Sequence, residues 1–155
     1  MSKSLRRVRA ALEGAGIAPD IREPGETRTA EQAAAAAGCA LDQIVKSILF
    51  CGAETGHVRL FLTAGGNRVC AERASALAGE ALGRADAALV RAETGFAIGG
   101  VAPIGLTQPC PTWADPRLLE FDVVWAAAGT PRHIFAIAPD RLVALSGATV
   151  AEFTA

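Results

Sequence analysis

Lys46 is the residue of this chain whose type and position most clearly suggest chemistry. It is the only charged residue of the segment Ile44-Val45-Lys46-Ser47-Ile48-Leu49-Phe50. A lysine there either extends its ammonium group to the surface or holds it in a partly dry pocket, where lost hydration and fixed partners determine its protonation. The chain has 13 Arg but only two Lys, and the two cations are not interchangeable in a tight pocket. Lys46 is therefore a candidate catalytic residue, with a solvated strand edge as the alternative.

A glycine-rich loop is the second candidate for chemistry. It contains the sequence Gly99-Gly100-Val101-Ala102-Pro103. Glycine accepts positive φ and has no Cβ, so such a loop brings main-chain N–H groups close to a ligand, while Pro103 stiffens its end. Donors fixed in this way bind a carbonyl or an oxyanion. The spacing matches neither G-x-G-x-x-G nor a Walker P-loop, so a purely structural turn is the alternative.

The segment Gly129-Thr130-Pro131-Arg132-His133 has the same two interpretations. It is an ordinary hairpin turn, or it directs the Thr130 hydroxyl and the His133 imidazole into a pocket. Gly129, Thr130 and His133 are therefore candidate binding residues.

Helices and strands in irregular order must position these candidates. Apolar spacing and capping residues predict helices over residues 5–15, 30–37, 72–78, 87–94 and 139–145. Alternating and β-branched residues predict strands over 46–50, 58–62, 68–70, 123–127, 133–138 and 149–152. Thr29 and Gln32 predict a capping box at the start of the second helix. Because no regular βαβ repeat occurs, we expect one α+β domain over residues 1–155 with a mixed, largely antiparallel sheet.

Charge limits the partners of this chain. Its formal net charge of -1 predicts no general attraction to polyanions, so any nucleic-acid contact must rest on local basic groups. The candidates are an N-terminal cluster and scattered arginines, namely Lys3, Arg6, Arg7, Arg9, Arg28, Arg68 and Arg73.

Cysteine and histidine usage indicates neither a metal nor a redox site. The four cysteines are widely spaced without a C-x-x-C pair, and His57 and His133 have no metal-ligand spacing. We therefore expect no metal and no cofactor. No segment approaches the length of a membrane span, and no apolar run follows the N-terminal basic residues, so we expect a cytoplasmic protein without a membrane partner.

Four segments together resemble the YbaK/ProX family of aminoacyl-tRNA deacylases, which is related to the editing domain of bacterial prolyl-tRNA synthetase. Each motif is short, but their order and spacing make the match specific over about residues 29–150. The segments are Thr29-Ala-Glu-Gln-Ala-Ala34, Gln43-Ile-Val-Lys-Ser-Ile-Leu-Phe50, Thr94-Gly-Phe96 with Gly99-Gly-Val-Ala-Pro-Ile-Gly-Leu106, and Ala128-Gly-Thr-Pro-Arg-His133.

The resemblance implies a fold, a reaction and a partner. The family's essential lysine falls on Lys46, and its G-x-x-x-P loop falls on Gly99 to Pro103. The implied fold is α+β, with a mixed sheet partly rolled into a barrel and packed helices. Members hydrolyse the ester between a wrong amino acid and the acceptor end of a tRNA, which is editing in trans. We expect a mischarged prolyl-tRNA carrying Ala, Cys, Ser, Thr or 2-aminobutyrate, with prolyl-tRNA synthetase as a further partner.

Two other functions stay open at this stage. The chain could be a module of the same fold that binds aminoacyl-tRNA or a synthetase without chemistry, although such a module has no need to keep the lysine and the glycine loop. A hydrolase of unrelated esters with a Cys or Ser nucleophile is less favoured, because no nucleophile lies beside a His/Asp pair in the sequence. The chain has no Tyr, so any tyrosine contact of relatives is absent here or supplied by Phe or Trp.

Overall fold

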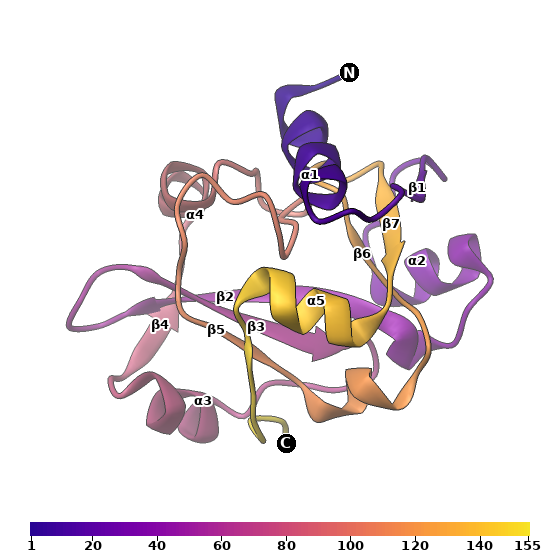
Figure 1. Ribbon diagram of the computed structural model, residues 1–155. Coiled ribbons are helices and arrows are strands. Elements are labelled where there is room, and N and C mark those ends of the chain that lie inside the picture. Colours follow the sequence, from indigo (N-terminus) through magenta and orange to yellow (C-terminus); the bar gives the residue numbers. More distant parts are fainter.

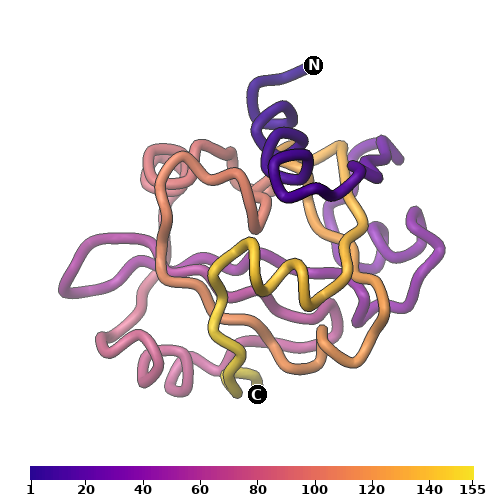
Figure 2. Tube along the Cα trace, viewed as in Figure 1, coloured from indigo at the N-terminus to yellow at the C-terminus, as the bar shows by residue number.

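The computed structural model describes residues 1–155, with the two termini at opposite ends of the molecule (Figures 1 and 2). Its α-helices are α1 (Lys3–Gly14), α2 (Ala30–Ala37), α3 (Ala71–Ala78), α4 (Ala87–Thr94) and α5 (Pro139–Ser146). Its strands are β1 (Ile21–Arg22), β2 (Ile44–Gly52), β3 (Val58–Ala64), β4 (Leu82–Arg84), β5 (Thr112–Ala114), β6 (Val124–Ala127), β7 (Ile134–Ile137) and β8 (Thr149–Val150). Two 3-10 helices, η1 (Leu41–Gln43) and η2 (Pro116–Glu120), complete the fold. None of the helices combines the length and hydrophobicity needed to cross a bilayer.

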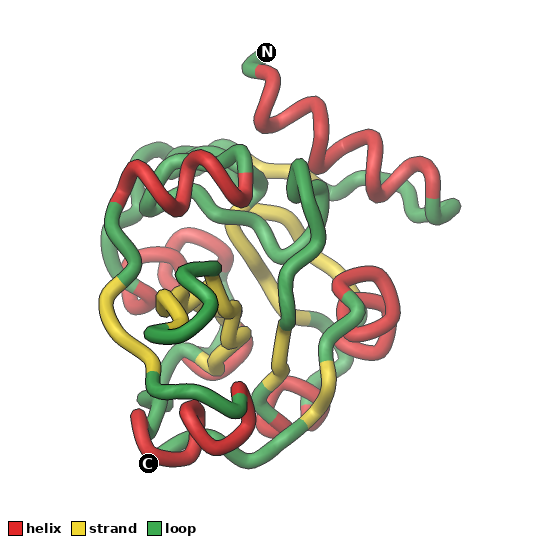
Figure 3. Tube along the Cα trace, turned by 90° about the vertical axis from the view of Figure 1, so that its left-hand side faces the viewer, coloured by secondary structure: helices red, strands yellow, loops and turns green.

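The strands form one mixed sheet, which confirms the predicted α+β class. Its order is β1-β7-β6-β2-β3-β5-β8, and β4 pairs with β2 outside this path. The pairs β1–β7, β2–β3, β2–β4 and β6–β7 are antiparallel, whereas β2–β6, β3–β5 and β5–β8 are parallel. After a 90° turn the strands lie on several sides of the interior, so the sheet is curved (Figure 3).

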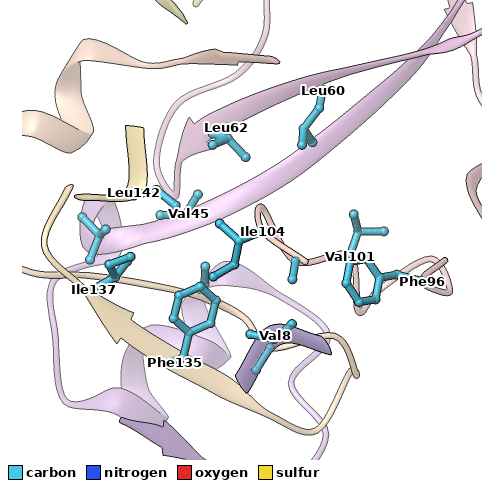
Figure 4. Packing of buried hydrophobic residues seen from close by; sticks show 14 of the residues in the cluster. Val8, Val45, Leu60, Leu62, Phe96, Val101, Ile104, Phe135, Ile137 and Leu142 are labelled. Atoms are coloured by element: carbon cyan, nitrogen blue, oxygen red, sulfur yellow. The ribbon is translucent and has the colours of Figure 1, made fainter. Parts of the chain in front are cut away.

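The β2–β3 hairpin is the centre of the fold because its two faces contribute to different cores. Side chains alternate along a strand, so Leu60 and Leu62 of β3 point into the main core with Val45 of β2, while Phe61 points to the other face. Helices α1, α4 and α5 cover the first face, where Val8 packs close to Phe135 (Figure 4). Helices α2 and α3 cover the second face.

The five predicted helices are confirmed, and the errors concern short elements. Strands β4 and β5 and helix η2 were not predicted, because two or three residues paired with a distant strand leave no periodic pattern. The strand predicted over 68–70 is wrong, since only a single bridge joins Val69 to Thr154. At the start of α2, Thr29 accepts from the N–H of Gln32 as predicted, but the Gln32 side chain accepts from the N–H of Arg28 rather than Thr29.

Strand β2 has two different neighbours along one edge, with a gap between them. It pairs with β6 at Ile44 and Val45, and with β4 from Phe50 to Gly52. Residues 46–49 have no strand partner on this edge, although their other edge pairs with β3. Lys46, the predicted catalytic residue, lies in this gap, so the predicted site is located where β2 has no partner strand on one edge.

Candidate active site

A cavity lies along the gap in the β2 edge. Its volume is about 370 Å³, and Lys46, Ser47, Ile48 and Leu49 all contribute to its wall. Apolar side chains from both faces of the sheet line most of it. Lys46 and Arg28 are its cations, and no acidic residue lines it. A cavity of this size and charge suits a small ligand that carries an anionic group and an apolar group.

Most of the predicted site residues meet at this cavity. Lys46, Gly99, Val101, Thr130 and His133 all line it, although they come from segments far apart in the sequence. The remaining three do not line it. Gly100 packs directly behind it against Thr130 and Pro131, Gly129 packs against Ser4 and Phe96, and Pro103 lines a second, smaller cavity near Leu145.

Lys46 is partly buried, and its ammonium group is held by the loop that follows β3. Its Nζ donates a hydrogen bond of 2.6 Å to the carbonyl oxygen of Asn67. The side chain lies on the same face of β2 as Ile44 and Ile48, which is the face covered by α2. The ammonium group is therefore held by a main-chain partner and forms no ion pair within 4 Å, although the Asp42 carboxylate is close enough to interact with it electrostatically.

Two aspartates hold the loop that carries the lysine's partner. Asp115, which is 2% exposed, accepts from the side-chain amide of Asn67 at 2.9 Å and from the N–H of Ala64 at 3.1 Å. Asp42 accepts from the N–H of Gly66 at 2.8 Å and from Arg117 at 3.0 Å. These residues do not line the cavity. Asp115 acts on Lys46 through the position of the Asn67 carbonyl, whereas Asp42 also interacts with the lysine electrostatically.

We expect the Asp42 contacts to make stability pH-dependent in acid. The hydrogen bond from Arg117 lowers the pKa of Asp42 below its usual range, against an opposing effect of burial. A carboxylate with a lowered folded-state pKa contributes stability above its unfolded pKa of about 3.9 and loses it as the pH falls through the folded value. The free energy of unfolding, measured with urea, should therefore decrease less between pH 6 and pH 3 for Asp42→Asn than for wild type. The exposed residue Asp122 supplies the control, since Asp122→Asn should behave as wild type; equal losses for all three proteins would contradict the prediction.

Two residues of the glycine loop that line the cavity have unpaired N–H groups. The N–H groups of Gly99 and Val101 have no hydrogen-bond partner in the protein, whereas the N–H of Gly100 donates to the carbonyl of Ala97 at 3.0 Å. Gly99 has φ +91°, a conformation that favours glycine. The two free N–H groups alternate with the occupied one, so Gly99 and Val101, rather than Gly100, have N–H groups available to a ligand.

Gly100 determines how closely the glycine loop approaches the 129–133 turn. A Cβ on Gly100 would lie 2.8 Å from both the Cα and the carbonyl carbon of Thr130. Gly100→Ala should therefore separate the two loops and lower kcat/KM for the proposed reaction by about 10²-fold, because misplacement by about 1 Å has this effect on catalysis. Gly83→Ala is the matched control, because a Cβ there meets no atom within 4 Å. Equal kcat/KM values for the two variants would show that the loop contact is unimportant.

Thr130 and His133 form a hydrogen bond at one end of the cavity, beside Glu23. Thr130 Oγ1 accepts from the N–H of Arg132 at 3.1 Å and lies 2.6 Å from His133 Nδ1. His133 Nε2 lies 3.5 Å from a carboxylate oxygen of Glu23. This arrangement suits His133 to holding the Thr130 hydroxyl in place.

The structure adds residues that the sequence interpretation did not assign to the site. Trp125 and Ile98 line the cavity, and Ile98 is 55% exposed in the glycine loop. Arg28, one of the scattered arginines, also lines it. Arg7 from the N-terminal basic cluster instead donates to the carbonyls of Gly95 and Gly105 and so anchors α1 to the body. The sequence marked Arg28 only as one of the scattered basic residues, and the fold brings it to the same cavity as Lys46.

Comparison with known proteins places this chain among relatives of similar sequence and fold. A protein provisionally assigned as a trans-editing enzyme for prolyl tRNA synthetase has a solved structure that is 46% identical, with a TM-score of 0.91 over 100% of this chain and 99% of its own. Hypothetical protein APE2540 is 27% identical, with a TM-score of 0.86 over 96% of this chain and 99% of its own. The uncharacterized protein YwhH of Bacillus subtilis (strain 168) is 30% identical over 140 residues, which are 90% of this chain and 88% of YwhH.

The family match spans most of the chain. It covers residues 24–145, which include every element that lines the large cavity. The resemblance to the YbaK/ProX group is thus confirmed, and this chain belongs to the aminoacyl-tRNA editing domain family.

Proposed function

We propose that this protein hydrolyses the ester of a mischarged prolyl-tRNA that carries a small uncharged amino acid. The observation that carries the proposal is a cavity lined by Lys46, by Gly99 and Val101 with their unpaired N–H groups, and by no carboxylate. An aminoacyl ester is already activated, so the enzyme mainly has to orient it and stabilise the oxyanion. No nucleophilic side chain is required.

Each polar group of the cavity has a role in this reaction. Lys46 binds the ester region or the terminal phosphate of the tRNA, and Arg28 adds positive charge for the acceptor end. The N–H groups of Gly99 and Val101 stabilise the oxyanion that forms when water attacks. Thr130, held by His133, binds the substrate rather than acting as the base.

The apolar wall favours an uncharged amino-acid side chain. Ala33, Ile44, Ile48 and Val90 are among the apolar residues that line it. Binding to an apolar pocket separates neighbours that differ by one methylene by only about 1–3 kcal/mol, so several small amino acids are candidates. We propose Ala, Cys, Ser, Thr and 2-aminobutyrate as the test set.

We further propose that prolyl-tRNA synthetase cooperates with this protein. The support is the relative at 46% identity, which is provisionally assigned as a trans-editing enzyme for that synthetase. A net charge of -1 gives weak attraction to free tRNA, so delivery by a synthetase would compensate.

The decisive experiment measures release of amino acid from prolyl-tRNA charged with each member of the test set. Correctly charged prolyl-tRNA is the substrate control, and the reaction is followed with and without the synthetase. We expect release from one or two members of the set and none from the correctly charged tRNA. Absence of release from every member, with the protein folded, would overturn the proposal and favour a binding module that lacks chemistry.

A further inference from the structure

The gap in the β2 edge exposes main-chain groups whose direction follows from the sheet register. In β3, the N–H of Leu60 donates to the carbonyl of Pro111, and the carbonyl of Leu62 accepts from the N–H of Asp115. The main-chain groups of Leu60 and Leu62 therefore face β5. Because successive residues of a strand face opposite neighbours, those of Phe61 face β2.

This direction fixes which residues of β2 face the gap. Phe61 is the register partner of Ile48, so the main-chain groups of Ile48 face β3. Ser47 and Leu49 lie on either side of Ile48, and their N–H and C=O groups face the opposite edge. Pairing with β6 stops at Val45, so no strand bonds Ser47 on that edge.

Ser47 is the least satisfied residue of the site. No loop residue hydrogen-bonds to its main-chain N–H or C=O. Its hydroxyl oxygen is also buried without a partner. Buried polar groups are normally paired, so an unpaired N–H, C=O and hydroxyl on one residue at the wall of a cavity indicates a polar ligand.

We propose that the aminoacyl group of the substrate occupies the gap as a single added strand residue paired with Ser47. Its α-ammonium donates to the C=O of Ser47, and its ester carbonyl accepts from the N–H of Ser47. A residue in an antiparallel sheet exchanges two such bonds with its partner, so the edge is complementary to the main-chain atoms of any α-amino acid. This inference rests on the proposed function and names the part of the site that recognises the amino acid.

The dimensions of the gap favour one residue over a peptide. Only Ser47 and Leu49 face it, and β6 and β4 close its two ends. Two residues of strand span roughly 7 Å, which leaves no room for a longer added strand. The free N–H groups of Gly99 and Val101 line the same cavity, so they can approach the ester carbonyl from a second direction.

Amide hydrogen exchange along β2 tests the open edge in the free protein. Ser47 and Leu49 should exchange at least about tenfold faster than Ile48 and Phe50, whose N–H groups bond to β3. Ile48 is thus an internal control between the two test residues. Equal protection of all four amides would mean that the edge is closed, and the inference would fail.

The bound state is tested with alanine joined through an amide to the 3′ position of 3′-amino-3′-deoxyadenosine, which cannot be deacylated. At saturation we expect the Ser47 amide to become protected while Ile48 stays unchanged. An analogue that binds without protecting Ser47, or that does not bind, would overturn the inference. Lysine-dependent release of amino acid from tRNA would still support the proposed function, so the two failures are distinguishable.

A substrate without the ammonium group tests the same contact by kinetics. Propionyl-tRNA, made by chemical acylation of the tRNA 3′ end, keeps the ester and the methyl group but has no α-substituent that can donate to the C=O of Ser47. We expect kcat/KM to fall about 10- to 100-fold relative to alanyl-tRNA, as for loss of a hydrogen bond to a charged group. Equal kcat/KM values for the two esters would exclude recognition of the ammonium group by the β2 edge.

Discussion

Replacing Lys46 by alanine is expected to lower kcat/KM for the mischarged tRNA by about 10³-fold or more, because a fixed cation in a water-poor site stabilises developing charge far better than water does. The variant should keep its fold. Nζ makes only one hydrogen bond, to the carbonyl of Asn67, and that carbonyl is held in place by other contacts. Release of labelled amino acid under single-turnover conditions measures the effect, and thermal unfolding checks the fold.

Two further lysine variants separate charge from a loss of structure. Lys3→Ala removes the other lysine, which is exposed in α1, and should leave kcat/KM unchanged. Lys46→Arg keeps the charge but replaces a compact ammonium with a forked guanidinium, so activity should recover only in part. Near-normal turnover by Lys46→Ala would remove the catalytic role and favour a different mechanism in the same cavity.

The sequence predicted those parts of the site that have a local signal. Lys46 stands out because a single charge interrupts an apolar strand, and Gly99 because adjacent glycines permit an unusual turn. The turn before His133 was recognisable from Gly-Thr-Pro. In each case the relevant physics, strand periodicity or permitted φ, acts within a few residues.

The remaining parts depend on contacts between distant segments. Gly100 packs on Thr130, whereas Gly129 packs on Ser4. The sequence does not predict this difference, because it depends on residues that are distant in the chain and close only in the folded protein. The gap beside Ser47 is also invisible in the sequence. It arises because β6 and β4 pair with opposite ends of one strand, and β4 is too short to predict.

The buried carboxylate of Asp115 shows how such distant contacts reach the active site. Asp115→Ala should lower the free energy of unfolding by roughly 3 kcal/mol or more, because the donors on Ala64, Asn67 and Arg117 lose a buried acceptor. In a chain of this length that corresponds to a decrease in Tm of about 6–12 °C. Asp115→Asn keeps part of the acceptor set, so its loss should be smaller.

Activity well below Tm distinguishes positioning of Lys46 from general loss of stability. Without Asp115 the side chain of Asn67 is released, so the carbonyl that holds the Lys46 ammonium loses its fixed position and kcat/KM should fall in the folded protein. Leu12→Ala is the matched control. It creates a cavity under α1 that should cost about 2–5 kcal/mol, but it touches neither the loop nor the site. If both variants kept wild-type kcat/KM at low temperature, the Asp115 network would serve stability alone; a decrease confined to Asp115→Ala would link this buried carboxylate to Lys46 and to its proposed catalytic role.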